Sequence, residues 1–295
     1  MNSEPSRPSG APPIAAHELD KGRVRQLASA AARHYDAAAW LPKQVAAALM
    51  EHLLPVRITP VRVLDVGAGT GICSRLLSAH YPSARIMCVD CAPPMLRVAR
   101  ARGPRWFSRH SYACGDAEAL PVADATIDLV VSSLMLPSCP SADAVLAEFH
   151  RVLKPGGLLM FTSLGPDTLG ELREAWRVVD DDVHVHAFID MHDLGDALLR
   201  AGLSDVVMDT ERFTGRYQDL SALTAEMTQL GVNNAALGRP KGLTTSCRLA
   251  CVAEEYEKAR RDRTLPASFE VVFGHGWRAP QRSVSVSSAA MMRSR

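Results

Sequence analysis

Short, mostly apolar segments alternate with segments of helical spacing between residues 60 and 165, and this alternation is what most constrains the fold. The apolar segments read VRVLDV, ARIMCVD, SYACGD, TIDLVVSS and LLMFTSL. Apolar strands of this kind belong to parallel sheets that are covered on both faces. Right-handed crossovers place the intervening helices on those two faces. The order therefore predicts an α/β fold with a doubly wound, mostly parallel sheet.

The rest of the 295-residue chain flanks this core. We expect residues 60–165 to form the ligand-binding core and residues 166–278 to add helices and the last strands beside it. The Pro-, Ser- and Gly-rich segments at 1–22 and 279–295 are typical of disordered tails. The sequence therefore predicts one domain over residues 23–278. No apolar run approaches the roughly 18 residues of a membrane span.

Composition excludes several classes of protein. The 33 Lys and Arg residues nearly balance the 32 Asp and Glu residues, and aromatic residues make up only 5% of the chain. Binding of nucleic acid through bulk charge is therefore excluded. Seven cysteines, an odd number, argue against a disulfide framework and fit a reduced, cytoplasmic protein. We predict no metal site, because buried thiols, a loop and a helix cap explain the possible ligands better: Cys88, Cys91, Cys247, Cys251, His184, His186 and His192.

The most informative segment is the turn after the first strand, which reads VLDVGAGTG at 63–71. Gly67, Gly69 and Gly71 let backbone N–H groups and a helix N-terminus approach a ligand closely. A dinucleotide-binding turn needs glycine where Ile72 stands. The acidic Asp65 beside the turn repels a pyrophosphate and favours a ligand with positive charge, such as an ammonium or a sulfonium.

Two further acidic residues follow strands at the same predicted edge of the sheet. Asp90 ends the second strand, 19 residues after Gly71, where a carboxylate accepts both hydroxyls of a ribose. Asp116 follows the third strand, can accept from the exocyclic amine of adenine, and is assigned to the ligand site together with Ala117. Ribose, adenine and a cationic tail together describe S-adenosylmethionine.

The motifs VLDVGAGTG, the Asp90 strand end, GDAEALP, DLVVSS and RVLKPGG resemble, in order, those of the class I S-adenosylmethionine-dependent methyltransferases. That family has a seven-stranded doubly wound sheet with an antiparallel last strand. The outer segments SAAARHYDAAAWL, LGPDTLGELREAW, FIDMHDLGDALLRAGL and EVVFGHGW resemble the malonyl-acyl-carrier-protein O-methyltransferases of early biotin synthesis. With these segments the resemblance extends from about residue 22 to residue 278.

The resemblance implies methylation of the free carboxylate of a malonyl thioester, carried by acyl carrier protein or coenzyme A. A carboxylate is ionised at neutral pH, so the reaction needs no general base. The resemblance assigns Tyr35 to a segment that folds over the cofactor, and its strand-end position makes Ser133 the second candidate catalytic residue. An Arg or Lys clamp would hold the carboxylate, and five candidates stay equivalent: Arg173, Arg177, Arg200, Arg212 and Arg216.

An acidic carrier protein needs a basic patch near the pocket, for which the chain offers two clusters. They consist of Arg97, Arg100, Arg102, Arg105 and Arg109, and of Lys258, Arg260, Arg261 and Arg263. Solvated helix faces are the alternative interpretation of both clusters. The oligomeric state is left open.

The chain departs from the family near the predicted substrate site. It reads Ser133-Leu134-Met135-Leu136-Pro137-Ser138 where the family usually has Asn-Leu-Ala-Leu-Gln-Trp, and Pro42 where it often has Gln. These differences leave three alternatives open: a methyltransferase of another small acid or a quinone, a homologue of the mitochondrial complex I assembly factor that hydroxylates an arginine, and a non-catalytic binding protein on the same fold.

Overall fold

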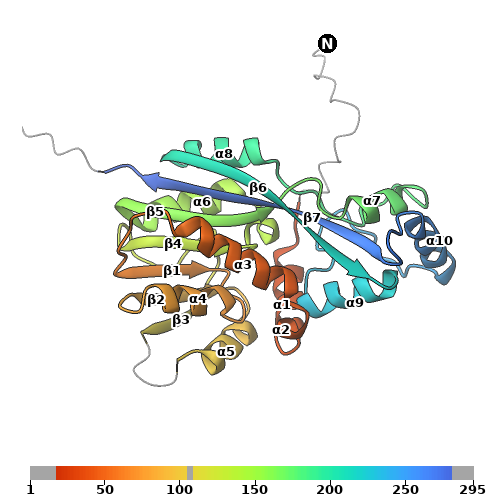
Figure 1. The fold of residues 1–295 in the computed structure, drawn as a ribbon, viewed down its shortest axis with the longest axis horizontal. Helices are drawn as coiled ribbons and strands as arrows, with labels where there is room; N and C mark the ends of the chain where they lie inside the picture. The colour runs from red at the N-terminus through yellow and green to blue at the C-terminus, as the bar shows by residue number, and fades with distance from the viewer. Residues whose placement is uncertain (1–17, 105–108, 281–295) are drawn as a thin grey trace, which may run out of the picture.

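One seven-stranded sheet forms the centre of the computed structural model, which describes residues 18–104 and 109–280 (Figure 1). The strand order is β3-β2-β1-β4-β5-β7-β6. Strands β1 to β5 run parallel, whereas β7 runs antiparallel to both of its neighbours. The predicted doubly wound sheet is thus confirmed. The strands are β1 (Arg62–Val66), β2 (Arg85–Asp90), β3 (His110–Cys114), β4 (Ile127–Ser133), β5 (Leu153–Leu164), β6 (Leu203–Tyr217) and β7 (Leu265–Arg278).

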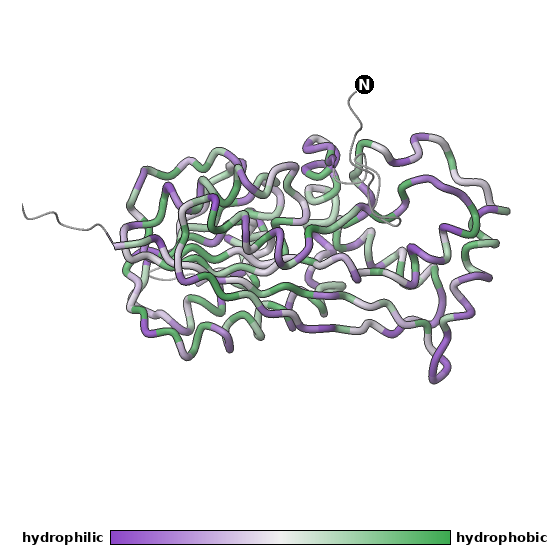
Figure 2. The backbone as a smooth tube through the Cα atoms, turned by 90° about the horizontal axis from the view of Figure 1, so that it is seen from above, coloured by the Kyte–Doolittle hydropathy of each residue, from purple (hydrophilic) through white to green (hydrophobic). Residues whose placement is uncertain are grey.

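Helices cover both faces of the sheet, as the apolar strands predict. Helices α3 (Trp40–Leu53), α4 (Ile72–His80) and α5 (Pro93–Arg102) contribute to the apolar cluster on one face. Helices α6 (Ala142–Val152) and α8 (Met191–Arg200) contribute to the cluster on the other face. Hydrophobic stretches run along the central strands, while hydrophilic stretches lie at many of the outer turns (Figure 2). The described residues contain no helix that is both long and apolar enough to cross a membrane.

Strands β6 and β7 form a long ribbon that continues past the rest of the sheet (Figure 1). Val271–Trp277 of β7 pairs with β5, but Leu265–Glu270 pairs with β6 alone. Helices α7 (Gly170–Arg177), α9 (Leu220–Leu230) and α10 (Ser246–Glu257) gather around this extension. The helices and strands expected beyond residue 165 therefore build a second, less regular half of the domain.

Side-chain caps start several helices, but α7 begins without one. The residues that accept from a backbone amide in the first turn are Asp20, Ser141, Asp190, Asp219 and Thr245. Asp167, which precedes α7, does not cap it in this way. Instead α7 follows Leu169, whose backbone is left-handed at φ 54°, and the Asp167 carboxylate pairs with Arg212 at 2.8 Å.

Residues just before the expected domain start at 23 also contact the rest of the chain. Leu19 is buried and forms a backbone bridge with Ala236, and the Asp20 amide donates to the Ala235 carbonyl at 2.9 Å. Helix α1 (Lys21–Ala31) begins there and is followed by the short α2 (Tyr35–Ala38). The remainder of the predicted tails, residues 1–17 and 281–295, lies outside the described residues.

The GHGW segment of β7, which had no chemical assignment, has a packing role. A Cβ atom at Gly274 would lie 2.4 Å from a ring carbon of Phe161, and one at Gly276 would lie 3.3 Å from the Cβ of Leu203. The two glycines therefore let β7 sit tightly against neighbouring side chains of β5 and β6.

Candidate active site

A cavity of about 380 Å³ opens at the carboxyl ends of β1, β2 and β3. Gly67, Asp90, Asp116 and Ala117 line it, so residues predicted from three separate motifs meet in one place. Ligand sites of open α/β sheets lie at this edge. The other walls come from the first turns of α1, from the ends of β1, β2 and β3, and from the segments after β2, β3 and β4: Lys21, Gly22, Val24, Arg25, Val66, Val89, Cys91, Cys114, Gly115, Met135, Ser138, Cys139 and Pro140.

Asp90 is buried at the end of β2 and is held by the backbone. Its Oδ2 accepts from the Gly69 amide and its Oδ1 from the Ala92 amide, both at 2.8 Å. Burial raises the pKa of this carboxyl, although the two amides act in the opposite direction. Each carboxylate oxygen can accept a second hydrogen bond. Asp90 therefore keeps capacity for the two hydroxyls of a ribose.

The three glycines of the turn all have positive φ angles, of 73° at Gly67, 52° at Gly69 and 80° at Gly71. Gly67 lines the cavity, and a Cβ there would lie 2.3 Å from the Cγ of Met135. Gly71 is the left-handed residue from which α4 begins. Gly69 and Gly71 thus shape the turn behind the cavity wall rather than line the cavity.

Asp65 lies behind the turn and does not line the cavity. It accepts from the Ser74 hydroxyl, while its Oδ1 is buried without a hydrogen-bond partner in the described chain. Burial raises the pKa of Asp65 to about 6, the Ser74 hydroxyl opposes the shift and the charge of Asp90 adds to it. An unpartnered buried carboxylate oxygen beside Asp90 suits a cationic group, so the donor set fits S-adenosylmethionine.

The first turn of α1 closes the cavity over Asp116. The Lys21 ammonium lies 2.7 Å from the Asp116 carboxylate and 2.7 Å from that of Glu118. Sequence reasoning missed Lys21, because no local pattern relates it to a strand end 95 residues later. The Asp116 carboxylate, predicted to accept from adenine, is therefore shared with a lysine.

A second cavity, of about 140 Å³, adjoins the first, and Val24 and Ser138 line both. Its walls are mostly apolar and come from α1, α3, α9, the start of β7 and the segments after β4 and β5. The apolar side chains include Leu27, Leu41, Leu134, Leu164, Phe188, Leu223, Met227 and Phe269. The arrangement suits a ligand with a non-polar arm that reaches the first cavity at one end.

Tyr35 begins α2 and lines the second cavity. Burial, with a smaller contribution from the charge of Asp90, raises the pKa of Tyr35 to about 12, so its hydroxyl is a neutral donor. The next residue, Asp36, accepts from the Thr70 hydroxyl and pairs with Arg102. These contacts tie the Tyr35-Asp36 segment to the glycine turn.

Ser133 ends β4 but lines neither cavity. Ser138 lies five residues later, at the end of a short 3-10 helix (Leu136–Ser138), and lines both. Pro42 and Pro137 also line the second cavity. Three of the positions at which this chain departs from the family's usual sequence, Pro42, Pro137 and Ser138, thus lie on the wall of one cavity.

The expected arginine clamp is not found in the described part of the second cavity, which no Lys or Arg lines. Four of the five candidates are exposed and paired with carboxylates: Arg177 with Glu174, Arg200 with Asp143, Arg212 with Asp167 and Arg216 with Asp262.

Arg173 differs from the other four arginines. It is half-buried and donates to the carbonyls of Pro166 and Thr168 at 3.0 and 3.1 Å. It forms no ion pair with a described residue, and burial lowers its pKa. Burial, helped by the charge of Arg173, also lowers the pKa of His186 to about 4, so the cavity wall carries a neutral imidazole there.

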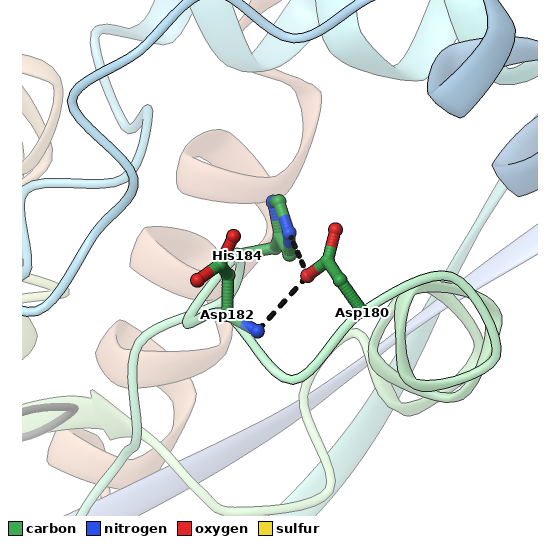
Figure 3. Close-up of side chains that lie close together, drawn as sticks. All are labelled: Asp180, Asp182 and His184. Carbon is green, nitrogen blue, oxygen red and sulfur yellow. Dashed lines mark hydrogen bonds and ion pairs between the residues drawn. The ribbon is translucent and has the colours of Figure 1, made fainter.

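Asp180, Asp182 and His184 lie close together after α7 (Figure 3). The His184 Nε2 is 2.7 Å from the Asp180 carboxylate, which also pairs with Arg248 of α10, while the imidazole stacks on Trp176 at 3.4 Å. A guanidinium already balances the carboxylates. We therefore interpret the group as a brace that connects α7, α10 and the cavity wall, and the absence of a metal role stays a prediction.

Comparisons with known proteins agree with this geometry. A family model described as "Methyltransferase domain" matches residues 64–161. The YcgJ protein of Bacillus subtilis has a similar structure, with a TM-score of 0.56 at 17% identity over 80% of this chain and 99% of that one. Phosphoethanolamine N-methyltransferase 2 of Haemonchus contortus, solved with S-adenosylhomocysteine, gives a TM-score of 0.54 at 17% identity over 85% of this chain and 57% of that one. Both neighbours support the fold.

Curated relatives are much more similar in sequence. Malonyl-acyl-carrier-protein O-methyltransferase of Laribacter hongkongensis is 46% identical over 270 residues, which cover 89% of this chain and 91% of that protein. The enzyme of the same name from Methylovorus is 45% identical over 92% of this chain and 93% of that protein. Such identity over nearly the whole length shows that the chain belongs to the malonyl-acyl-carrier-protein O-methyltransferase family of S-adenosylmethionine-dependent methyltransferases.

Proposed function

We propose that the protein transfers a methyl group from S-adenosylmethionine to the free carboxylate of a malonyl thioester carried by acyl carrier protein, an early step of biotin synthesis. One observation carries the proposal beyond family membership. The second, apolar cavity meets the first cavity at Val24 and Ser138, so a substrate on an arm and an adenosyl cofactor would meet end to end. Residues 18–280 would act as one catalytic domain.

Backbone geometry and three carboxylates would hold the cofactor. Asp90, fixed by the amides of Gly69 and Ala92, would accept from the ribose hydroxyls. Asp116 and Ala117 would face the adenine, and the buried Asp65 behind the turn would act on the cationic part through its charge rather than by contact. Gly67 would allow close approach to the backbone, with Gly69 and Gly71 setting the turn.

The reaction asks the protein for orientation rather than for proton transfer. When bound, S-adenosylmethionine supplies an electrophilic methyl group that an ionised carboxylate takes without a general base. The hydroxyls of Tyr35 and Ser138 line the cavity and would donate to the substrate carboxylate, holding one oxygen while the other stays exposed. Orientation of this kind lowers a barrier by several kcal/mol, about 7 in favourable cases. Ser133 would act indirectly, because it ends β4, the strand that supports the segment carrying Ser138.

Methyl transfer to malonyl-acyl carrier protein, followed by intact-protein mass spectrometry, tests the proposal. A mass increase of one methyl group that depends on S-adenosylmethionine is the expected result, with malonyl-CoA as the parallel substrate. Succinyl- and acetyl-carrier proteins are the matched controls, since one has a longer acid and the other has none. No methyl ester on either malonyl substrate, under conditions where calorimetry detects bound cofactor, rules the proposal out.

A further inference from the structure

Helices α1 and α5, which pack side by side, carry basic residues and no acidic ones. The chain has no Asp or Glu from Lys21 to Tyr35, nor from Cys91 to Gly115. Small apolar side chains hold the two helices together in one cluster that includes Ala31, Ala32, Ala92 and Met95. Two basic segments far apart in the sequence thus form one continuous face.

Most of the described arginines on this face are exposed and have no acidic side chain paired with them. Arg25, Arg33, Arg97 and Arg100 are exposed, and none forms an ion pair within the described ranges 18–104 and 109–280. Arg102 is the exception, because Asp36 pairs with it. Arg105, from the same predicted cluster, lies outside the described residues.

The second predicted basic cluster behaves differently. At the end of α10, Lys258 pairs with Glu255 at 2.6 Å and Arg260 pairs with Glu257 at 2.6 Å. These i, i+3 partners neutralise two of the cluster's four cations, whereas Arg261 and Arg263 are exposed and form no ion pair among the described residues, so the cluster keeps only part of its attraction for an acidic surface. Within the part of the chain that the structure describes, the α1–α5 face has more unpaired arginines than the α10 cluster, so it is the stronger candidate for binding an acidic surface.

A groove of about 580 Å³ runs between the two helices on this face. Its lining combines small apolar or hydroxyl side chains with one arginine from each side, Arg33 before α2 and Arg97 on α5. The other lining residues are Ser29, Ala30, Ala32, Pro94, Val98 and Ala101. A shallow apolar floor between two cations fits a helix that has an apolar stripe and acidic flanks.

The groove and the second cavity, the proposed substrate site, are both lined by residues of α1. Val24 and Leu27 of α1 line the second cavity, and Arg25 lines the first cavity. Ser29 of the same helix and Arg33, just after it, line the groove. A single helix, roughly 10 Å across, therefore separates the groove from the site. A partner in the groove would sit within reach of the cavity for an arm that it carries.

We propose that the α1–α5 groove is the docking site for an acidic helix of the carrier protein that presents the thioester substrate. The inference rests on the proposed function, because the groove itself shows only the charge and shape of its occupant. Charged residues at the rim of such an interface raise the association rate and make it sensitive to salt.

Charge reversal separates this proposal from the proposed function. The double variant Arg33→Glu/Arg97→Glu is compared with Lys258→Glu/Arg260→Glu, which changes the net charge equally at the two paired cations near the end of α10. Each is assayed with malonyl-carrier protein and with malonyl-pantetheine, which has the thioester and arm without a protein. Calorimetry with the cofactor checks that both variants are folded.

The groove variant should lose about tenfold or more in kcat/KM with the carrier substrate, mostly through KM, and show a flatter salt dependence. Its rate with malonyl-pantetheine and its cofactor affinity should not change, and the α10 variant should resemble wild type. The docking site is overturned if the groove variant keeps its rate with the carrier substrate, or if it loses equally with both substrates. In either case, methylation by the wild-type enzyme leaves the proposed function standing. Failure of wild type to methylate either substrate overturns both.

Discussion

The half of the domain around β1–β4 and the half around the β6–β7 ribbon build their cavities by different means. In the first, backbone amides and glycine turns at strand ends form the wall, and Asp90 is fixed by the amides of Gly69 and Ala92. In the second, side chains from distant segments meet on the ribbon. Glu226 of α9, for example, accepts from both the Trp40 indole, at 2.6 Å, and the Tyr217 hydroxyl, at 2.7 Å.

This difference has a consequence for how each half tolerates change. A site made of backbone depends on a few φ angles and fails at single glycine positions. A site made of side chains depends on packing and hydrogen bonds spread over many positions, so its composition can drift while the shape persists. The departures at Pro42, Pro137 and Ser138 all fall on the wall of the second cavity, where this tolerance is greatest.

The largest effect should follow from Gly67→Ala. The change forces an L-residue into φ 73° and places its Cβ 2.3 Å from the Met135 side chain. Left-handed strain costs about 1–2 kcal/mol and overpacking about 1–3 kcal/mol. Because Gly67 and Met135 both line the first cavity, relief of the clash would reshape its wall, so cofactor binding should weaken by up to about 1,000-fold. Isothermal titration calorimetry with S-adenosylmethionine measures this loss.

Gly156→Ala is the matched control, because that glycine has φ 78° but open space around its Cβ position. It should lose about 1 kcal/mol of stability and keep its cofactor affinity. Equal cofactor affinities for the two alanine variants would show that the glycine turn does not contact the cofactor.

A smaller effect is expected from Glu226→Ala in the ribbon half. The change leaves the Trp40 indole N–H and the Tyr217 hydroxyl without their acceptor, at about 1–3 kcal/mol for each buried donor. Urea denaturation should show a loss of about 4 kcal/mol in the free energy of unfolding. Both donors share the Oε1 atom, so Glu226→Gln keeps an acceptor oxygen for both and should lose much less. A full loss of cofactor affinity in the folded alanine variant would contradict the separation of the two halves.

The stability of the β1–β4 half should depend on pH through Asp65. Its folded-state pKa, raised to about 6 by burial, exceeds the ordinary value of 3.8, so the folded state binds the proton more tightly. The stability contribution of this group is complete below pH 3.8 and is lost as the pH rises to about 6, by up to about 3 kcal/mol.

Asp65→Asn should remove this loss. The variant without cofactor should be about 2 kcal/mol more stable than wild type at pH 7.5 in urea denaturation, and it should bind S-adenosylmethionine more weakly. Ser74→Ala serves as the control, because it removes the hydroxyl and keeps the carboxylate. Wild-type cofactor affinity in Asp65→Asn would show that the carboxylate plays no part in binding.

The strand-end residues could be predicted because their positions follow from local patterns. A glycine turn after an apolar strand, and an acidic residue at each of two later strand ends, are properties of short segments, and parallel strands bring those ends together. Asp90 and Asp116 therefore meet Gly67 in one cavity. The fold was predictable for the same reason, since the alternation of segments is itself local.

The substrate side could not be predicted in the same way, because its contacts join segments that no local pattern relates. Lys21 reaches Asp116 and Glu118, Trp40 reaches Glu226, and Arg248 reaches Asp180. Five arginines looked equivalent in the sequence, and only the structure separates the paired, exposed ones from Arg173. Asp167, next to the start of α7, likewise pairs with Arg212 of a distant strand.

The smallest effect concerns Arg173 and His186, at the wall of the second cavity. The pKa of His186 is lowered to about 4, chiefly by burial and secondly by the charge of Arg173. Its stability contribution is therefore complete above pH 6.5 and is lost as the pH falls to about 4.

Arg173→Gln removes the charge but keeps a donor for the Thr168 carbonyl, so the His186 pKa should rise by less than about one unit, because burial remains. Histidine NMR titration measures the shift, with Arg177→Gln as the exposed control that should leave it unchanged. A lower His186 pKa in the Arg173 variant would contradict the assignment, and a KM for the malonyl thioester raised more than about tenfold would instead make Arg173 a direct substrate ligand.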